Sequence, residues 1–236
     1  MTGTLLNILT VLLGGGLGLA LGGRVPERLR QTVVAGLGLF TIGFGIRMFL
    51  QTQNPIAPLI GLLLGGLLGE WWRIEDRLEG LGVWLENRLT RSTASERGSR
   101  FVRGFLTASL VFCVGPMTVL GSIQDGLTGD YELLAVKSTL DGFGALAFAS
   151  TLGPGVLFSI LIIAVYQGSL TLLAAQAQAL LTDSMVAEMT AAGGVILIGI
   201  AISSLLEIRK IRSANLLPAL VVAPAVAWLF KFFGLG

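Results

Sequence analysis

Long apolar segments constrain this chain more than any other feature of its sequence. Eight of them can be marked, at residues 4–22, 32–50, 56–72, 105–123, 138–153, 155–177, 190–207 and 214–230. A helix needs about 20 apolar residues to cross a hydrocarbon core about 30 Å thick. Only 13% of the residues are charged, against about 25% in soluble domains. The sequence therefore predicts an all-α, polytopic helical membrane protein in contact with the lipid bilayer.

The basic residues predict how these segments are oriented. Thirteen of the 16 Lys and Arg residues fall in three loops, at 23–31, 73–104 and 208–213. Because cytoplasmic loops collect such residues, we expect these loops inside and both termini outside. That arrangement needs an even number of crossings. Eight spans satisfy it, and so do six spans with two re-entrant arms in place of spans four and five.

The loop at 73–104 is the one sizeable insertion between spans. Leucine and isoleucine residues recur there at helical spacing among Arg and Glu, and Trp71, Trp72 and Trp84 belong naturally at headgroup level. We expect an amphipathic helix on the inner membrane surface, followed by a polar linker, Thr90–Arg100. A nucleic-acid partner is not expected, because acidic residues interrupt the basic ones.

Glycines recur at every fourth position in two spans. They are Gly14, Gly18 and Gly22 in the first span and Gly61, Gly65 and Gly69 in the third. Such spacing favours close helix packing, either within one protomer or in a homodimer, and we expect a homodimer. A pathway lined by the glycine backbone is the less favoured interpretation.

The chain also indicates an internal repeat within one membrane domain, 1–236. Residues 35–43 resemble 191–199, and 54–58 resemble 215–218. The predicted topology makes the two copies inverted, with repeat-like halves at about 1–72 and 155–236. Inverted repeats are typical of secondary transporters, whose binding sites lie near the membrane midplane in broken helices. Similar composition alone is the alternative explanation, since apolar sequences match one another easily.

Residues 105–155 form a central pair of spans with helix breakers. Gly115-Pro116 interrupts the first, and Gly153-Pro154-Gly155 closes the second. Proline within a helix frees the carbonyl one turn earlier, and a freed carbonyl can bind a cation. The alternative is a packing kink in which Thr118, Ser122 or a neighbouring helix satisfies that carbonyl.

Three ionisable residues lie at the facing ends of this pair. Asp125 follows Ser122 and Gln124, while Lys137 and Asp141 are spaced to pair on one helical face. Charges within spans are costly and mark functional sites. Asp125 and Asp141 could therefore bind a cation or exchange a proton for one, with Lys137 either contributing or simply neutralising Asp141. The metal, if any, stays open, and the isolated Asn7, Gln167 and Ser203 are expected to make interhelical hydrogen bonds.

Several kinds of chemistry are not expected. The chain has no histidine, and Cys113 is its one cysteine, so neither a zinc site built from Cys and His nor a histidine-dependent catalytic dyad is available. Gly14-Gly15-Gly16 lacks the strand and the Lys-Ser/Thr of a nucleotide-binding loop. We therefore expect no cofactor and no enzymatic activity.

Four segments resemble a known family. They are Phe112–Gly126 (FCVGPMTVLGSIQDG), Lys137–Phe143 (KSTLDGF), Ala149–Val156 (ASTLGPGV) and Gly3–Asn7 (GTLLN). Together they are similar to the bacterial YqgA/YdfK membrane family, a family of unknown function, and the likeness extends over nearly the whole chain. It implies an inner-membrane protein, and some members have been described as transporters. It names no substrate.

The sequence thus favours a secondary transporter or channel for an ion or small solute, with its site in the interrupted central helices. A non-catalytic assembly or sensory protein is the alternative. A membrane enzyme is the less favoured third, since its mechanism would rest on Asp125, Lys137 and Asp141 alone.

Overall fold

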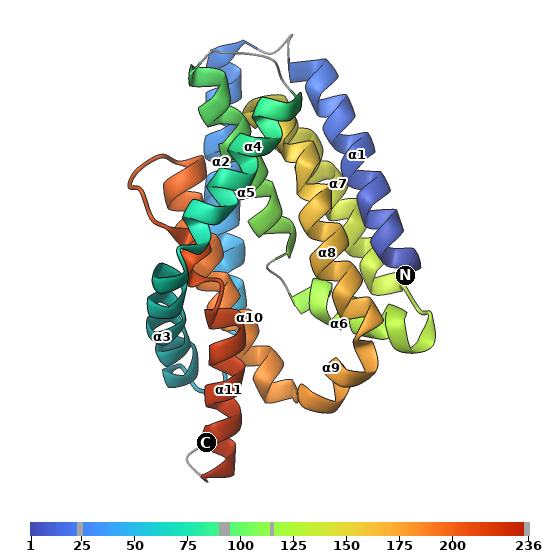
Figure 1. Ribbon diagram of the computed structural model, residues 1–236, viewed down its shortest axis with the longest axis vertical. Helices are drawn as coiled ribbons and strands as arrows, with labels where there is room; N and C mark the ends of the chain where they lie inside the picture. Colours follow the sequence, from blue (N-terminus) through green and yellow to red (C-terminus); the bar gives the residue numbers. More distant parts are fainter. Residues whose placement is uncertain (23–25, 90–94, 114–115, 234–236) are drawn as a thin grey trace. The chain divides into compact units, whose positions relative to one another are not determined.

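The structure is a computed structural model that describes residues 1–22, 26–89, 95–113 and 116–233 (Figure 1). Within those ranges the chain is helical and has no strand. The α-helices are α1 (Thr2–Gly22), α2 (Glu27–Phe49), α3 (Ile56–Trp72), α4 (Ile74–Leu89), α5 (Ser95–Cys113), α6 (Pro116–Thr128), α7 (Glu132–Leu152), α8 (Ser159–Leu172), α9 (Ala174–Leu180), α10 (Asp183–Ile200) and α11 (Ala219–Phe232). Short 3₁₀ helices precede α8 (Pro154–Phe158) and α11 (Ser213–Leu216), and a π-helical segment, Ala201–Leu205, extends α10.

Five of the described helices, counted with these extensions, are long and apolar enough to cross a membrane: Thr2–Gly22, Glu132–Leu152, Pro154–Leu172, Asp183–Leu205 and Ser213–Phe232. A sixth crossing results if the bent pair α5 and α6 counts as one span. Val34–Phe49 and Ile56–Trp72 are shorter apolar helices. The predicted all-helical membrane fold is confirmed, while the total of eight spans stays a prediction.

The described residues form two compact units. Unit 1 comprises Met1–Gly36, Leu78–Cys113 and Met117–Ala177; unit 2 comprises Leu37–Arg77, Val114–Pro116 and Gln178–Gly236. These groups differ from the halves expected from the repeat, because α1 belongs with α7 and α8 whereas α3 belongs with α10 and α11. The division into repeat-like halves stays a prediction.

In unit 1, α1 lies along α7 and runs in the same direction (Figure 1). Gly14 faces the backbone of Gly142, Gly18 that of Leu146, and Gly22 that of Ser150. A Cβ at Gly22 would lie only 2.7 Å from the Ser150 carbonyl oxygen. The absence of Cβ atoms therefore lets the two backbones touch, as the glycine spacing predicted.

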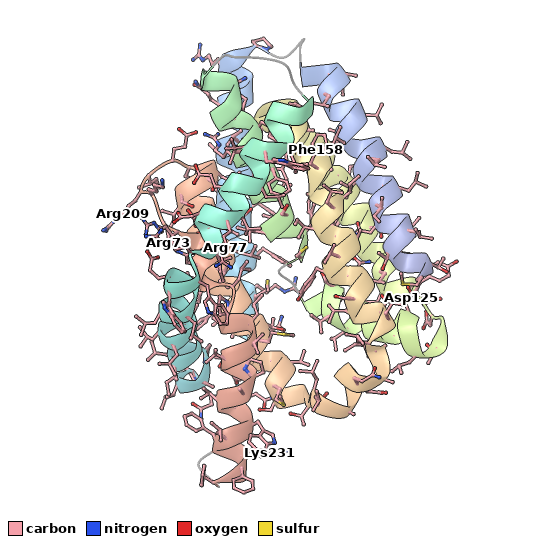
Figure 2. All side chains as sticks on the ribbon, in the orientation of Figure 1. Arg73, Arg77, Asp125, Phe158, Arg209 and Lys231 are labelled. Carbon is pink, nitrogen blue, oxygen red and sulfur yellow. The ribbon has the colours of Figure 1, made fainter. Side chains whose placement is uncertain are left out.

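The hairpin between α7 and α8 is the predicted break at Gly153-Pro154-Gly155. Gly153 has φ +88°, which favours glycine, and proline opens the following 3₁₀ turn. Gly155 lies directly against the Phe101 carbonyl, where no side chain fits. Beside it, Leu85 of α4 and Phe101, Val102 and Phe105 of α5 form an apolar cluster that also contacts Phe158, labelled in Figure 2.

In unit 2, α3 packs antiparallel to α11. Gly61 faces Ala223, Gly65 faces Ala219 and Gly69 faces Asn215. Both glycine repeats of the sequence are thus occupied by contacts within the chain. They give no reason of their own to expect a homodimer.

Several predicted boundaries are wrong, among them the start of span seven, which lies at Asp183 rather than 190. Electrostatics explains one of the others. Span five begins at Glu132 rather than 138, because Lys137 and Asp141 lower the local hydropathy but neutralise each other on one helical face. Residues 95–100, expected as linker, form the first turns of α5. The rest of that linker, 90–94, lies outside the described residues. The predicted amphipathic helix is α4, whose place on the membrane surface stays a prediction.

Candidate functional site

Polar side chains of unit 1 converge on the first two turns of α1. We use the name α1 polar cluster for Thr4, Asn7, Asp125, Lys137, Asp141, Gln167 and Thr171. They come from α1, α6, α7 and α8, and each is at most 8% exposed. Their burial in an apolar helical bundle is what makes the group unusual.

Asp125 binds the first turn of α1 (Figure 2). Its Oδ2 accepts a hydrogen bond from the Gly3 N–H at 3.1 Å, and the α-amino group of Met1 lies 2.9 Å from the same oxygen. The carboxylate is 1% exposed. A backbone N–H at a helix start is one of the four donors without an intrahelical partner, so a carboxylate is a favourable ligand for it.

Asp141 binds the second turn of α1. Asn7 Nδ2 donates to Asp141 Oδ2 at 3.0 Å, and the Lys137 ammonium forms an ion pair with that oxygen. The predicted pairing of Lys137 with Asp141 is therefore confirmed. Asp141 is the tenth residue of the 21-residue helix α7 and lies near its middle, not at its end as the sequence indicated.

Gln167 and Thr171 of α8 complete the cluster. Asn7 Nδ2 also donates to Gln167 Oε1 at 2.9 Å, Gln167 Nε2 donates to Thr4 Oγ1 at 3.3 Å, and the hydroxyls of Thr4 and Thr171 lie 3.4 Å apart. These pairs show that α8 runs antiparallel to α1. The predicted interhelical hydrogen bonds of Asn7 and Gln167 are confirmed, whereas the one predicted for Ser203 is wrong, because its hydroxyl donates to Ile200 O one turn earlier in the same helical segment.

The two carboxylates are brought to one side of α1. Their partners, Gly3 and Asn7, are four residues apart, which corresponds to about 6 Å along a helix. Asp125 and Asp141 therefore bind successive turns of the same helix. Lys137 supplies a positive charge to Asp141, and the α-amino group of Met1 supplies one to Asp125.

The helix break has a structural explanation that does not need a ligand. The axes of Arg100–Cys113 and Met117–Thr128 differ by 61°. Because Pro116 has no N–H, the carbonyl of Phe112 loses its helical donor. The Thr118 hydroxyl donates to that carbonyl at 3.3 Å, which favours the packing alternative for Thr118 and Pro116. The predicted ligand Gly115 lies outside the described residues.

Ser122 and Gln124 have different surroundings on α6: the first is buried and the second is exposed. Ser122 lies one turn before Asp125 on the buried face, and its Oγ has no hydrogen-bond partner among the described residues. Gln124 is exposed, and its amide donates to Asp130 Oδ2 at 2.7 Å. The structure therefore does not bring Gln124 to the buried group that includes Asp125.

The sequence interpretation missed the part that α1 and α8 play. Thr4 and Asn7 are spaced at i,i+3, and Gln167 and Thr171 at i,i+4, so each pair marks one polar face of an otherwise apolar helix. That spacing was the available signal.

A third buried carboxylate, which lies in unit 2, was missed as well. Glu188 of α10 is 1% exposed and accepts hydrogen bonds from the Thr52 hydroxyl and from the Gln53 and Asn54 N–H groups at 2.7 and 2.9 Å. All three donors come from the turn before α3. Glu188 thus fastens that turn to α10.

The comparisons with known proteins decide the family. The family described as "Protein of unknown function (DUF554)" matches residues 2–228. The chain belongs to the DUF554 family. It is 29% identical to the "Uncharacterized membrane protein YdfK" of Bacillus subtilis (strain 168), over 100% of this chain and 99% of that protein. It is 32% identical to the "Uncharacterized protein YqgA" of Escherichia coli (strain K12), over 98% of each chain. No solved structure matches.

The resemblance seen in the sequence is therefore correct, and this DUF554 chain is a helical membrane protein. Its described residues contain no group of three or more His, Cys, Asp or Glu side chains able to hold a metal ion. The α1 polar cluster instead mixes two carboxylates with amides, hydroxyls and an ammonium group.

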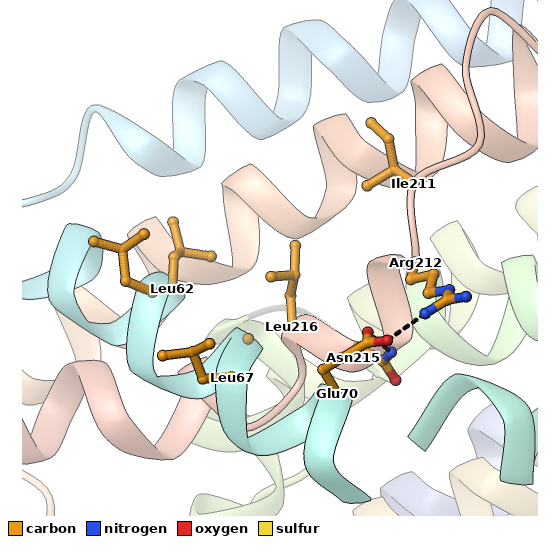
Figure 3. A pocket seen from close by; sticks show the side chains of 9 residues that line it. Leu62, Leu67, Glu70, Ile211, Arg212, Asn215 and Leu216 are labelled. Atoms are coloured by element: carbon orange, nitrogen blue, oxygen red, sulfur yellow. Dashed lines mark hydrogen bonds and ion pairs between the residues drawn. The ribbon is translucent and has the colours of Figure 1, made fainter. Parts of the chain in front are cut away.

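Unit 2 of this DUF554 chain also has a surface groove, shown in Figure 3. Its volume is about 440 Å³, and Leu62, Leu67 and Leu216 are among its apolar walls. At one end Glu70 accepts from Arg212 and from Asn215 Nδ2, the latter at 2.6 Å. These polar groups satisfy one another, so the groove carries no chemistry comparable to that of the cluster.

Proposed function

We propose that this protein is a secondary transporter or channel that moves an ion or small solute across the bacterial cytoplasmic membrane, with its binding site at the α1 polar cluster. The observation that carries the proposal is the convergence of Asp125, Lys137 and Asp141 on two turns of α1, all buried. No catalytic role is proposed for any of them.

The energetic cost of this arrangement supports the proposal. Removing charges from water costs several kcal/mol per ion even after relaxation. A protein in which apolar residues of similar size replace a buried ion pair is often equally stable or more stable. The helix contacts of unit 1 do not require these charges, since α1 and α7 already meet through glycines. Ionisable residues within membrane spans commonly mark the path of an ion or proton.

The arrangement of unit 2 is compatible with an inverted repeat, which we include in the proposal. The helices that contain or follow the similar segments pack antiparallel: α2 against α10, with Gly45 and Gly194 in contact, and α3 against α11. Two inverted copies related by a two-fold axis in the membrane plane would pack in this way.

Helix directions within each unit also agree with the topology expected from the basic loops. Spans that should run the same way, α1 and α7, are parallel. Pairs that should run oppositely, α1 with α8 and α3 with α11, are antiparallel. We propose that the loops 23–31, 73–104 and 208–213 face the cytoplasm and both termini face outward.

Solid-supported membrane electrophysiology on purified protein in liposomes tests the proposal. The protein would be exposed to rapid concentration jumps of alkali cations, protons, inorganic anions and amino acids, one solute at a time. We expect charge movement for at least one of them, lost in Asp125→Asn and Asp141→Asn. Asp130→Asn, in which a half-exposed carboxylate outside the cluster is changed, is the matched control and should keep it.

Two results would count against the proposal. Normal charge movement in both cluster variants would remove the site assignment. Absence of any response across the panel would favour the alternative, a non-catalytic assembly or sensory protein in which the cluster only fastens helices.

A further inference from the structure

We infer that the α1 polar cluster takes a monovalent alkali cation, and that the Lys137 ammonium is its intramolecular competitor for Asp141. This inference rests on the proposed function, because it names what that site would bind and how the site is closed when nothing is bound.

The ligand atoms of the cluster suit a hard cation. They are carboxylate, amide and hydroxyl oxygens, without sulfur or imidazole nitrogen, and such oxygens bind alkali and alkaline-earth ions rather than transition metals. One of these oxygens, Asn7 Oδ1, makes no hydrogen bond with the described residues. Asn7 donates through Nδ2 to both Asp141 and Gln167, while its Oδ1 is buried and has no hydrogen-bond partner among the described residues.

Ser122 adds a second oxygen of the same kind. Its residue is 0% exposed, its hydroxyl has no partner within the described ranges, and it lies one turn from Asp125 on the buried face of α6. An unpartnered buried polar atom is costly and calls for an explanation. A cation bound in the α1 polar cluster would supply the missing partner to Asn7 Oδ1, and Ser122 is the nearest unpartnered hydroxyl along α6 from Asp125.

Charge decides between monovalent and divalent ions. Lys137 neutralises Asp141, and the α-amino group of Met1 neutralises Asp125, so each carboxylate of the cluster is paired with one positive charge. A monovalent cation can replace the ammonium group one for one and leave the total charge of the site unchanged. A divalent ion would leave one uncompensated positive charge in an apolar bundle, which is costly.

The chemistry of lysine makes the exchange feasible. Its ammonium is a compact point charge on a flexible four-carbon stem, unlike the rigid two-point fork of arginine. Lys137 lies one turn from Asp141 on the same helix, so the contact between them depends on the rotamer of a flexible side chain.

Thermal unfolding in detergent tests the competition. Melting temperatures would be measured in NaCl and in choline chloride at equal ionic strength, for the unsubstituted protein, for Lys137→Met, and for Lys210→Met as a matched lysine at an exposed site. We expect sodium to raise the melting temperature of the unsubstituted protein. In Lys137→Met we expect a larger rise, at a midpoint sodium concentration lower by about tenfold or more, since the competing charge is gone.

A purely structural ion pair predicts something else. Lys137→Met would then lose stability equally in both salts, and that result would overturn the inference. A larger shift with MgCl₂ or CaCl₂ than with NaCl would also overturn it. Should Lys137→Met fail to fold, the sodium shift of the unsubstituted protein decides: its presence, abolished in Asp141→Asn, supports the inference, and its absence contradicts it.

The test separates this inference from the proposed function. Sodium-dependent stabilisation without charge movement in liposomes would leave the cation site standing and remove transport. If instead an anion or a neutral solute causes charge movement that depends on Asp125 and Asp141, and sodium does not stabilise the protein, transport stands and the cation site is removed.

Discussion

At the residue scale, the account depends on which buried charges have partners. Lys137 and Asp141 have each other, and Asn7 donates to the same carboxylate oxygen. Breaking a buried ion pair by removing one partner typically costs about 3–5 kcal/mol, because the remaining charge stays in an apolar environment. Replacing both partners by apolar residues removes that penalty.

Lys137→Met alone should therefore lower the free energy of unfolding by about 3–5 kcal/mol in a sodium-free buffer. The double variant Lys137→Met with Asp141→Leu should recover most of that loss, yet it should not transport. Chemical denaturation in mild detergent and the liposome assay provide the two measurements. A double variant that transports normally would show that the pair has only a structural role.

Glu188 is the residue-scale case in unit 2. Glu188→Leu should leave the donors of Thr52, Gln53 and Asn54 without an acceptor, at about 1–3 kcal/mol for each donor that stays dry. Asp183→Leu changes an exposed carboxylate five residues earlier on α10 and is the control. Equal stability of the two variants in denaturant titrations would show that water replaces the carboxylate and that the turn is not fastened.

At the element scale, glycine spacing determines which helices touch. Gly18 lies against the backbone of Leu146 in α7, where a side chain has no room. Two residues earlier on the same helix, Gly16 has nothing within 4 Å of the place where its Cβ would be. The same substitution should therefore have opposite consequences at these two positions.

We expect Gly18→Leu to prevent α1 from packing on α7 and to yield aggregated protein. Gly16→Leu should be as stable as the unsubstituted protein or more so, since leucine favours a helix over glycine by about 0.5–1 kcal/mol. Size-exclusion chromatography with thermal unfolding makes the comparison. Equal behaviour of both variants would contradict the assigned α1–α7 contact.

The element scale also shows what the sequence could predict. The apolar segments and glycine spacing indicate the helices and their contact faces, because both depend on local periodicity. The start of α7 could not be read in this way, since a hydropathy window treats Lys137 and Asp141 as two charges and has no term for their neutralisation. The choice of partners, α1 with α7 and α8, depends on contacts far apart in the chain.

Only part of the candidate site could be predicted from the sequence. The cost of burying Asp125 and Asp141 singles them out in any apolar segment. Their common partner, α1, has no charged side chain and gave no comparable signal. Gln124, next to Asp125 in the sequence, is exposed, a distinction that needs the position of the neighbouring helices.

At the scale of the whole molecule, the basic loops imply one orientation in the membrane. In a Cys113→Ser background, Gln53→Cys should react in intact cells with a thiol reagent that does not cross membranes, and Lys210→Cys should react only after permeabilisation. Both positions are exposed, so access from either side of the membrane decides the result. Labelling of position 210 from outside would reverse the proposed topology.

The central claim is that the buried cluster of unit 1 becomes accessible to a solute from water. The most direct measurement is the reaction of Ser122→Cys, in the Cys113→Ser background, with a small charged thiol reagent in liposomes, using the exposed Gln124→Cys as the matched position on α6. The account predicts that position 122 reacts more slowly than 124 but measurably, from one face of the membrane, and that sodium ions protect it. Complete protection of position 122 from both faces in every salt, with normal reaction at 124, would contradict the account.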